Sequence, residues 1–312
     1  MRTADRVFGI DPDARASQLA KLYFLTLIFS GGAGVLAAGL LRRLALRLGC
    51  SERASELTAF AYAFGTLVFP FSTALFGHQL AAVLLLGAVV LMVEARDEGR
   101  LREPRVLVAL GALWATTLVV EYPTALLVAV FGTTLLVWTF ERARPLATVR
   151  TLLFAAAGGA LPMIVHVAFL FWAYGKLALP YTYVSEPYFR AHMSGGFLGI
   201  GIPEWIATYG TLFSPYRGIL FYCPVLVLSV AGLGAWLASG RAMHLLVVLV
   251  PAYAIYLLFA FSYYAWDGGG STGPRHLLPL LPYVMLPIAF FADRSRLAFG
   301  VTLIGRWRIL RV

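Results

Sequence analysis

The chain is poor in charge and in cysteine. Only 13% of its 312 residues are charged, and it has 15 acidic residues against 25 Lys and Arg. Soluble domains carry about 25% charged residues, so we do not expect a soluble globular domain. The two cysteines are Cys50, beside a basic stretch, and Cys223, inside an apolar run. This usage predicts neither a disulfide nor a cysteine metal site.

Apolar sequence takes the place of charge. Hydrophobic residues make up 60% of the chain. A helix needs about 20 apolar residues to cross the hydrocarbon core of a bilayer. Apolar segments near this length lie at 22–41, 57–75, 78–94, 106–120, 124–140, 151–173, 218–238, 243–264 and 275–292. We therefore expect an all-α, polytopic membrane protein of about nine transmembrane helices, forming one integral membrane domain over residues 1–312.

The positions of the arginines predict the topology. They occupy every second connection, at 42, 43, 47 and 53, then 96, 100, 102 and 105, then 142, 144 and 150, then 241, then 294 and 296. Short loops rich in Lys and Arg face the cytoplasm. This places segment 1–17 outside and the basic tail 293–312 in the cytoplasm. Because the arginines form short clusters between apolar segments, nucleic acid is not an expected partner.

One long connection, 174–217, separates helices 1–6 (18–173) from helices 7–9 (218–292). It is rich in aromatic residues, is punctuated by Pro and Gly, and carries few charges. Trp and Tyr concentrate at the headgroup level of a bilayer. We therefore expect this connection to form short interfacial helices on the outer face.

Two outer helix ends look short. The run 57–69 meets Pro70, and the run 106–120 ends at Glu121, Tyr122 and Pro123. At about 1.5 Å per residue, helices of this length fall short of the hydrocarbon core. A helix that stops within the membrane must shelter its backbone in protein or in a water-filled cavity. The sequence therefore predicts a recess on the outer side.

Ionisable groups that border membrane spans are costly, which makes them candidate functional residues. Arg275 follows Gly273 and Pro274 and begins an apolar segment, so its guanidinium and free backbone amides suit a phosphate. The candidate carboxylates are Glu121 and Asp267. The candidates for binding substrate or phosphate are Arg217, Arg275, His78, His276, Tyr122 and Tyr216.

Simpler interpretations of these residues stay open. Arg217 fits a side chain that snorkels to the interface, and His78 fits an interfacial helix start. Glu121 fits a loop acid facing water, and His166, in the middle of an apolar segment, fits a helix–helix hydrogen bond.

Four stretches stand out in order along the chain: "FGTLVFPFSTALFGHQLAAVLLLGAVVLM" (64–92), "VVEYPTALLVAV" (119–130), "YGTLFSPYRGILFYCPVLVL" (209–228) and "WDGGGSTGPRHLLPLLPYVMLPIA" (266–289). They resemble bacterial membrane glycosyltransferases of the GT-C superfamily, in particular the relatives of protein mannosyltransferases and lipid A aminoarabinose transferases. The resemblance implies a GT-C-like fold and transfer of a sugar from a polyprenyl-phosphate donor to an acceptor on the non-cytoplasmic side of a bacterial inner membrane. Such enzymes begin with a further span and an outer loop that bears an acid, so we expect the chain to be truncated at its N-terminus.

These implications assign roles to the candidates. Glu121 or Asp267 would deprotonate the acceptor hydroxyl, and Arg217 and Arg275 would hold the donor phosphate. The expected partners are a polyprenyl-phosphate-linked sugar, a lipid, glycan or protein acceptor, and membrane lipids. No cofactor is required, although a divalent metal is compatible with the site. The alternative is a non-catalytic carrier or flippase for lipid-linked sugars, or a membrane subunit.

Overall fold

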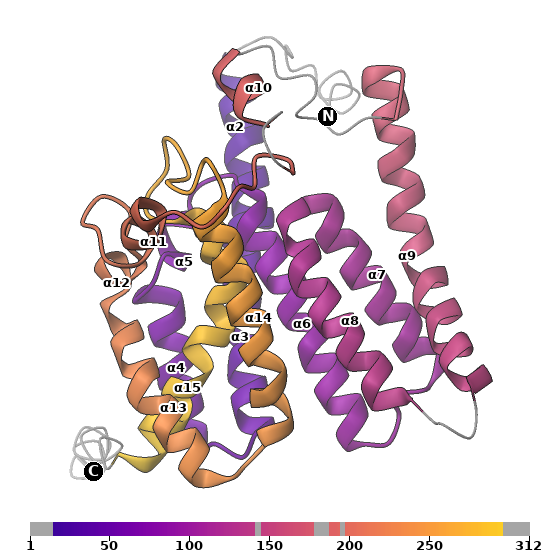
Figure 1. The fold of residues 1–312 in the computed structure, drawn as a ribbon, viewed down its shortest axis with the longest axis vertical. Helices are drawn as coiled ribbons and strands as arrows, with labels where there is room; N and C mark the ends of the chain where they lie inside the picture. Colours follow the sequence, from indigo (N-terminus) through magenta and orange to yellow (C-terminus); the bar gives the residue numbers. More distant parts are fainter. Residues whose placement is uncertain (1–14, 141–144, 178–186, 194–196, 296–312) are drawn as a thin grey trace, which may run out of the picture.

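The computed structural model describes residues 15–140, 145–177, 187–193 and 197–295. Within these ranges the chain is almost entirely helical, with isolated β-bridges and no named strand (Figure 1). The predicted all-α class is therefore confirmed. Most of the predicted outer segment 1–17 and tail 293–312 lies outside the described residues.

The first half of the chain runs from α2 to α9. Helices α2, η1 and α3 follow one another without a break, and η1 is a π-helical segment. The bounds are α2 Arg15–Thr26, η1 Leu27–Gly32, α3 Ala33–Arg47, α4 Glu52–Phe64, α5 Val68–Ser72, α6 Gly77–Asp97, α7 Pro104–Val120, η2 Tyr122–Thr124, α8 Ala125–Thr139 and α9 Pro145–Tyr174.

The second half begins with the long connection, which contains the short helices α10 and α11. Helix α15 packs against α4 and α13, and α14 packs against α8, so the two halves share one bundle. The bounds are α10 Pro187–Met193, α11 Trp205–Leu212, α12 Ile219–Tyr222, η4 Pro224–Leu226, α13 Val227–Ser239, α14 Met243–Ser262, η5 Arg275–Leu280 and α15 Leu281–Arg294.

Six helices are long and apolar enough to cross a membrane, so the described chain has the character of a multi-pass membrane protein. They are Ala16–Arg47, Gly77–Asp97, Tyr122–Thr139, Leu146–Tyr174, Met243–Ser262 and Arg275–Arg294. Pro104–Val120 and Pro224–Ser239 are shorter apolar helices. The count of nine spans stays a prediction.

Of the two helix ends that were predicted to come early, one agrees with the structure and one does not. Helix α7 ends at Val120, as expected, but α4 ends at Phe64 and Pro70 lies inside α5. The break follows Gly65, the C-cap of α4, where a Cβ atom would lie 2.7 Å from the Ala61 carbonyl oxygen. The segment 57–75 is therefore two helices joined by a bend.

The connections with many arginines gather at one end of the bundle. Figure 1 shows the α3–α4, α6–α7 and α13–α14 connections together at its lower end, here called the arginine-rich end. Arg241 donates a hydrogen bond to the Gly49 carbonyl and pairs with Asp293 at 2.9 Å, and Asp293 also accepts from the Ser51 amide at 3.0 Å. Polar contacts thus join two of these connections to the end of α15, from parts of the sequence that are far apart.

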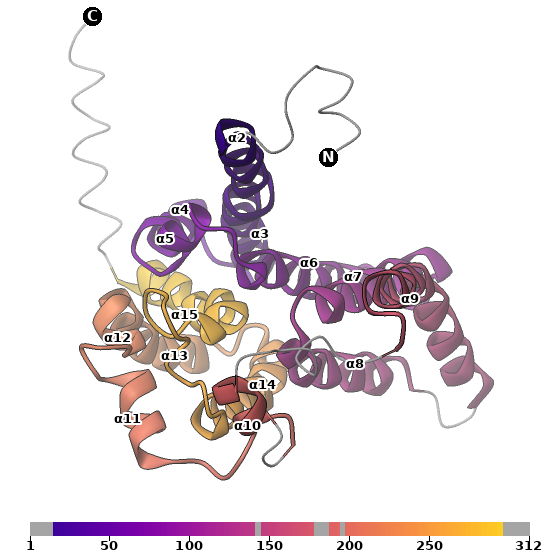
Figure 2. The ribbon, with the colours of Figure 1, turned by 90° about the horizontal axis from the view of Figure 1, so that it is seen from above.

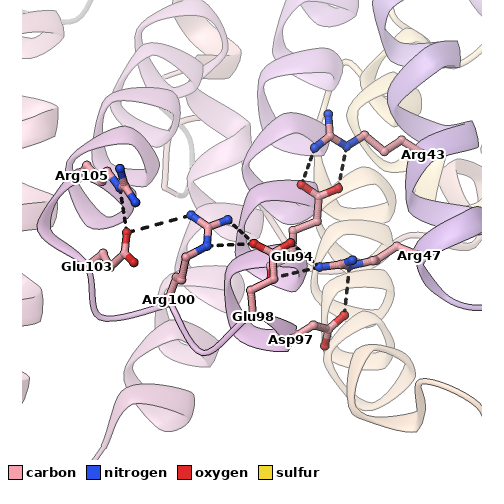
Figure 3. Close-up of polar contacts among 8 residues, drawn as sticks. All are labelled: Arg43, Arg47, Glu94, Asp97, Glu98, Arg100, Glu103 and Arg105. Atoms are coloured by element: carbon pink, nitrogen blue, oxygen red, sulfur yellow. Dashed lines mark hydrogen bonds and ion pairs between the residues drawn. The ribbon is translucent and has the colours of Figure 1, made fainter.

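Ion pairs connect α3 to the end of α6 and the following turn (Figure 3). Arg43 pairs with Glu94, and Arg47 pairs with Glu98, each at 2.6 Å. Glu98 also accepts a hydrogen bond from Arg100, which lowers the pKa of its carboxyl. Since the pairs share partners, they act as a network that fixes the ends of α3 and α6 relative to each other.

Helix α9 docks on α7 through small residues. A Cβ atom added at Gly111 would lie 1.8 Å from the Ala155 carbonyl oxygen, and one added at Gly158 would lie 1.9 Å from that of Val108. Such close backbone approach is typical of small residues at helix interfaces in membranes. Figure 2 shows α9 beside α7 at the edge of the bundle, on the far side from α11 and α12.

We predict that Gly158→Ala destabilises the protein, because the new methyl group must push α9 away from α7. Overpacking of this kind costs about 1–3 kcal/mol. The measurement is thermal unfolding of the purified protein in detergent. Gly132→Ala, in α8, is the matched control, since a Cβ there meets no atom within 4 Å. Equal melting temperatures for the two variants would contradict the close packing.

Candidate functional site

A cavity of about 410 Å³ opens at the end of the bundle opposite the arginine-rich end, here called the cavity end. It lies where α6 begins and α7 ends, between η2, the end of α14 and η5. Five of the eight candidate residues line it: His78, Glu121, Tyr122, Arg275 and His276. The structure thus brings together residues from distant parts of the sequence, in a recess where one was predicted.

His78 and Glu121 form a close pair in this cavity. His78 Nδ1 lies 2.8 Å from Glu121 Oε1, and their side chains are 8% and 20% exposed. Glu121 is the C-cap of α7, in an extended conformation, and His78 is the second residue of α6. A Cβ at Gly77 would lie 2.9 Å from Glu121 Oε1, so the glycine makes room for the pair.

His276 lies beside this pair. Its ring meets the His78 ring edge to face, with centroids 5.4 Å apart, and also meets the rings of Phe259 and Tyr263. Its Nε2 atom is buried and has no hydrogen-bond partner within the described residues. The imidazole therefore keeps hydrogen-bonding capacity in an aromatic surrounding.

Arg275 lies across the face of Phe76, with its Cζ atom 5.2 Å from the ring centroid. Its Nε atom is buried and unpartnered in the described part of the chain. A Cβ at Gly268 would lie 3.1 Å from Arg275 Cγ, so the glycine loop packs closely on the arginine stem. The cavity thus holds one guanidinium, two imidazoles and one carboxylate.

Tyr122 is fixed by α9. Its hydroxyl lies 3.0 Å from His166 Nε2, which confirms the predicted interhelical hydrogen bond of His166. This contact connects the cavity to α9, which lies at the edge of the bundle in Figure 2.

Three candidates lie beside the cavity rather than in its lining. Arg217 is only 8% exposed, donates a hydrogen bond to the Gly269 carbonyl, and lies 4.5 Å over the Tyr216 ring. Asp267 Oδ1 accepts from the Gly269 amide at 3.1 Å. Their contacts shape the loop 267–273, in which Gly268, Gly269 and Gly273 have positive φ. Burial of Arg217 also argues against simple snorkelling.

The long connection covers part of the cavity. The Gly201 amide donates to the Ser262 carbonyl at 2.8 Å, and the Tyr264 amide donates to that of Gly199 at 3.0 Å. This pairing places Phe197, Leu198 and Ile200 in the lining. Sequence analysis missed these residues and the rings of Phe76, Phe259 and Tyr263, because aromatic side chains occur throughout the chain.

No family model, no curated protein and no solved structure matches the chain. Within the described residues, no group of three or more His, Cys, Asp and Glu side chains is placed to hold a metal ion. What the geometry defines is a multi-pass helical membrane protein with a polar, aromatic-walled cavity at one end. The resemblance to GT-C enzymes stays a prediction.

We predict that Arg217→Ala loosens the glycine loop, because hydrogen bonds to charged groups contribute about 1.5–3 kcal/mol. Amides of Gly268–Ser271 should then exchange with solvent about tenfold faster or more. The measurement is hydrogen exchange read by mass spectrometry in detergent. Tyr216→Leu is the control, since it removes the ring and keeps the bond from Arg217 to Gly269. Unchanged amide exchange in Arg217→Ala would show that the loop keeps its conformation without this hydrogen bond.

Proposed function

We propose that the protein is a glycosyltransferase of GT-C type that moves a sugar from a polyprenyl-phosphate donor to an acceptor hydroxyl. The reaction takes place on the non-cytoplasmic side of a bacterial inner membrane, with the arginine-rich end in the cytoplasm. One observation carries the proposal: a carboxylate–imidazole pair faces an arginine and a second imidazole inside one cavity of the cavity end.

The pair of His78 and Glu121 supplies the base. Glu121 accepts the Nδ1 proton of His78, which leaves Nε2 of that ring as the proton acceptor. A base held in this way by a carboxylate is a common arrangement for general acid–base catalysis and contributes about 10²–10⁴-fold in rate. Of the two candidate carboxylates, Glu121 lies in the cavity, whereas Asp267 holds its own loop.

Arg275 supplies the charge that the leaving group needs. The acceptor oxygen attacks the anomeric carbon with inversion, and its proton passes to His78. The bond from that carbon to the phosphate oxygen breaks, and the electron pair leaves with the polyprenyl phosphate. A guanidinium at this point offsets the negative charge as it develops. His276 Nε2, which is buried and unpartnered among the described residues, is placed to donate to the same phosphate or to the sugar.

The remaining lining suits a sugar. Rings of Phe259, Tyr263 and Phe197 present apolar faces beside polar groups, and cavities of about 300–1,000 Å³ hold small ligands. Ion channels favour rings of one charge sign. The mixture of an acid, an arginine and histidines therefore favours an anionic sugar donor over a conducted ion.

We predict that Glu121→Gln and Arg275→Ala each reduce sugar transfer about 100-fold or more. The measurement uses membranes supplied with a panel of polyprenyl-phosphate sugars and follows the loss of labelled donor. Asp267→Asn should reduce transfer much less, which separates the two carboxylates. Arg105→Ala is the control, because that side chain is 78% exposed at the arginine-rich end.

Two results would overturn the proposal. Absence of transfer across the whole panel by the unaltered protein would exclude the enzyme. Movement of intact labelled lipid across vesicles, without cleavage of the sugar–phosphate bond, would instead identify a carrier or flippase.

A further inference from the structure

A second cluster of basic and aromatic side chains lies at the arginine-rich end, where α6 and α8 end and α14 begins. The Arg96 guanidinium lies over the Trp138 ring, with its Cζ atom 4.7 Å from the ring centroid. The His244 ring meets the same indole edge to face, with centroids 5.6 Å apart. One tryptophan therefore holds a cation and an imidazole side by side.

The hydrogen-bonding capacity of this cluster is unused within the described residues. His244 Nε2 is buried and unpartnered there. Arg96 makes no ion pair with a described residue, whereas Arg43 and Arg47, on neighbouring α3, pair with Glu94 and Glu98 (Figure 3). The Asp97 carboxylate lies close enough to His244 to act on its charge but pairs with Arg47 at 3.4 Å. Among the described residues, the ion-pair network therefore leaves Arg96 without a carboxylate partner.

The start of α14 adds the backbone amides of Met243 and His244, since those of Leu245 and Leu246 donate to the Ala242 carbonyl at 3.0 and 3.4 Å. Its N-cap is Ala242, so no side chain caps the amides of the first turn, and His244 is its second residue. The N-terminal end of a long helix carries partial positive charge and binds anions. The guanidinium, the imidazole and the helix end thus combine donors and positive charge in one place.

The positions of the three residues along their spans indicate how deep in the membrane the cluster lies. Arg96, Trp138 and His244 each lie one residue from the end of a candidate span, namely Gly77–Asp97, Tyr122–Thr139 and Met243–Ser262. Span ends lie near the boundary between hydrocarbon and headgroups, where tryptophan concentrates. An anion at this depth is most simply the phosphate of a phospholipid.

We propose that this cluster binds the phosphodiester headgroup of an anionic phospholipid. Arg96 binds the phosphate oxygens with two parallel N–H donors, and His244 and the α14 amides donate from the protein side. By the positive-inside rule the arginine-rich end faces the cytoplasm, where anionic lipids give the membrane surface its negative potential. The proposal does not depend on the function of the cavity.

Arg150 provides a matched control within the chain. It lies in α9 with its Cζ atom 5.4 Å over the Phe154 ring, which is also a cation–aromatic contact. Among the ring contacts of the described residues, Phe154 meets no histidine. A general attraction between arginines and anionic lipid would involve both residues, whereas a built site involves Arg96 alone.

The experiment is native mass spectrometry of the purified protein in detergent, titrated with phosphatidylglycerol or phosphatidylcholine. We expect one phosphatidylglycerol to remain bound and Arg96→Ala to weaken its binding about tenfold or more. His244→Gln should weaken it less, and Arg150→Ala should match the unaltered protein. Melting temperatures are recorded for each variant, and Arg96→Lys, which keeps the charge but loses the planar guanidinium, should bind at an intermediate level.

Three results would overturn this proposal. Equal retention of phosphatidylcholine would indicate ordinary annular lipid, and an equal loss in Arg150→Ala would indicate unspecific charge attraction. Displacement of the lipid by millimolar inorganic phosphate would indicate a site for a free anion rather than for a lipid.

Discussion

The structure depends on one constraint, which is that a backbone inside a bilayer must satisfy its own polar groups. Helices meet this need along most of the chain. They are interrupted between α4 and α5, between α7 and η2, between α12 and η4, and around η5. These interruptions lie toward the cavity end, whereas the arginine-rich end closes with simple turns. The cavity therefore forms where the helices stop being regular, and its polar groups come from the residues at those interruptions.

The fold class and the alternation of the two ends could be predicted from the sequence, because apolar length and arginine spacing are local signals. His78, Glu121, Arg275 and His276 could be predicted as candidates for a related reason, and the structure places them in the lining of one cavity. An ionisable side chain is rare in such a chain, so its position next to an apolar segment stands out. Arg217 and Asp267 carry the same signal, but their contacts turn them toward the glycine loop.

The rest of the site could not be predicted, because it depends on how helices face one another. His78 can pair with Glu121 only if the start of α6 and the end of α7 lie side by side and are rotated about their axes so that the two side chains face each other. Gly77 leaves the space that the pair needs. No sequence pattern in either segment predicts this relative rotation of the two helices. The aromatic residues of the cavity lining could not be distinguished from the other aromatic residues either, since 14% of the chain is aromatic. The interruption of 57–75 was missed because Gly65 lies inside an otherwise continuous apolar run.

The two ends of the molecule are held by different forces, and this gives them different sensitivities to the solution. Partly exposed ion pairs join α3 to the end of α6 at the arginine-rich end, and dissolved salt weakens exposed ion pairs. At the cavity end, backbone hydrogen bonds and packed rings hold the segments, and salt affects these contacts little. We therefore expect higher ionic strength to loosen the arginine-rich end of the bundle while the cavity end keeps its shape.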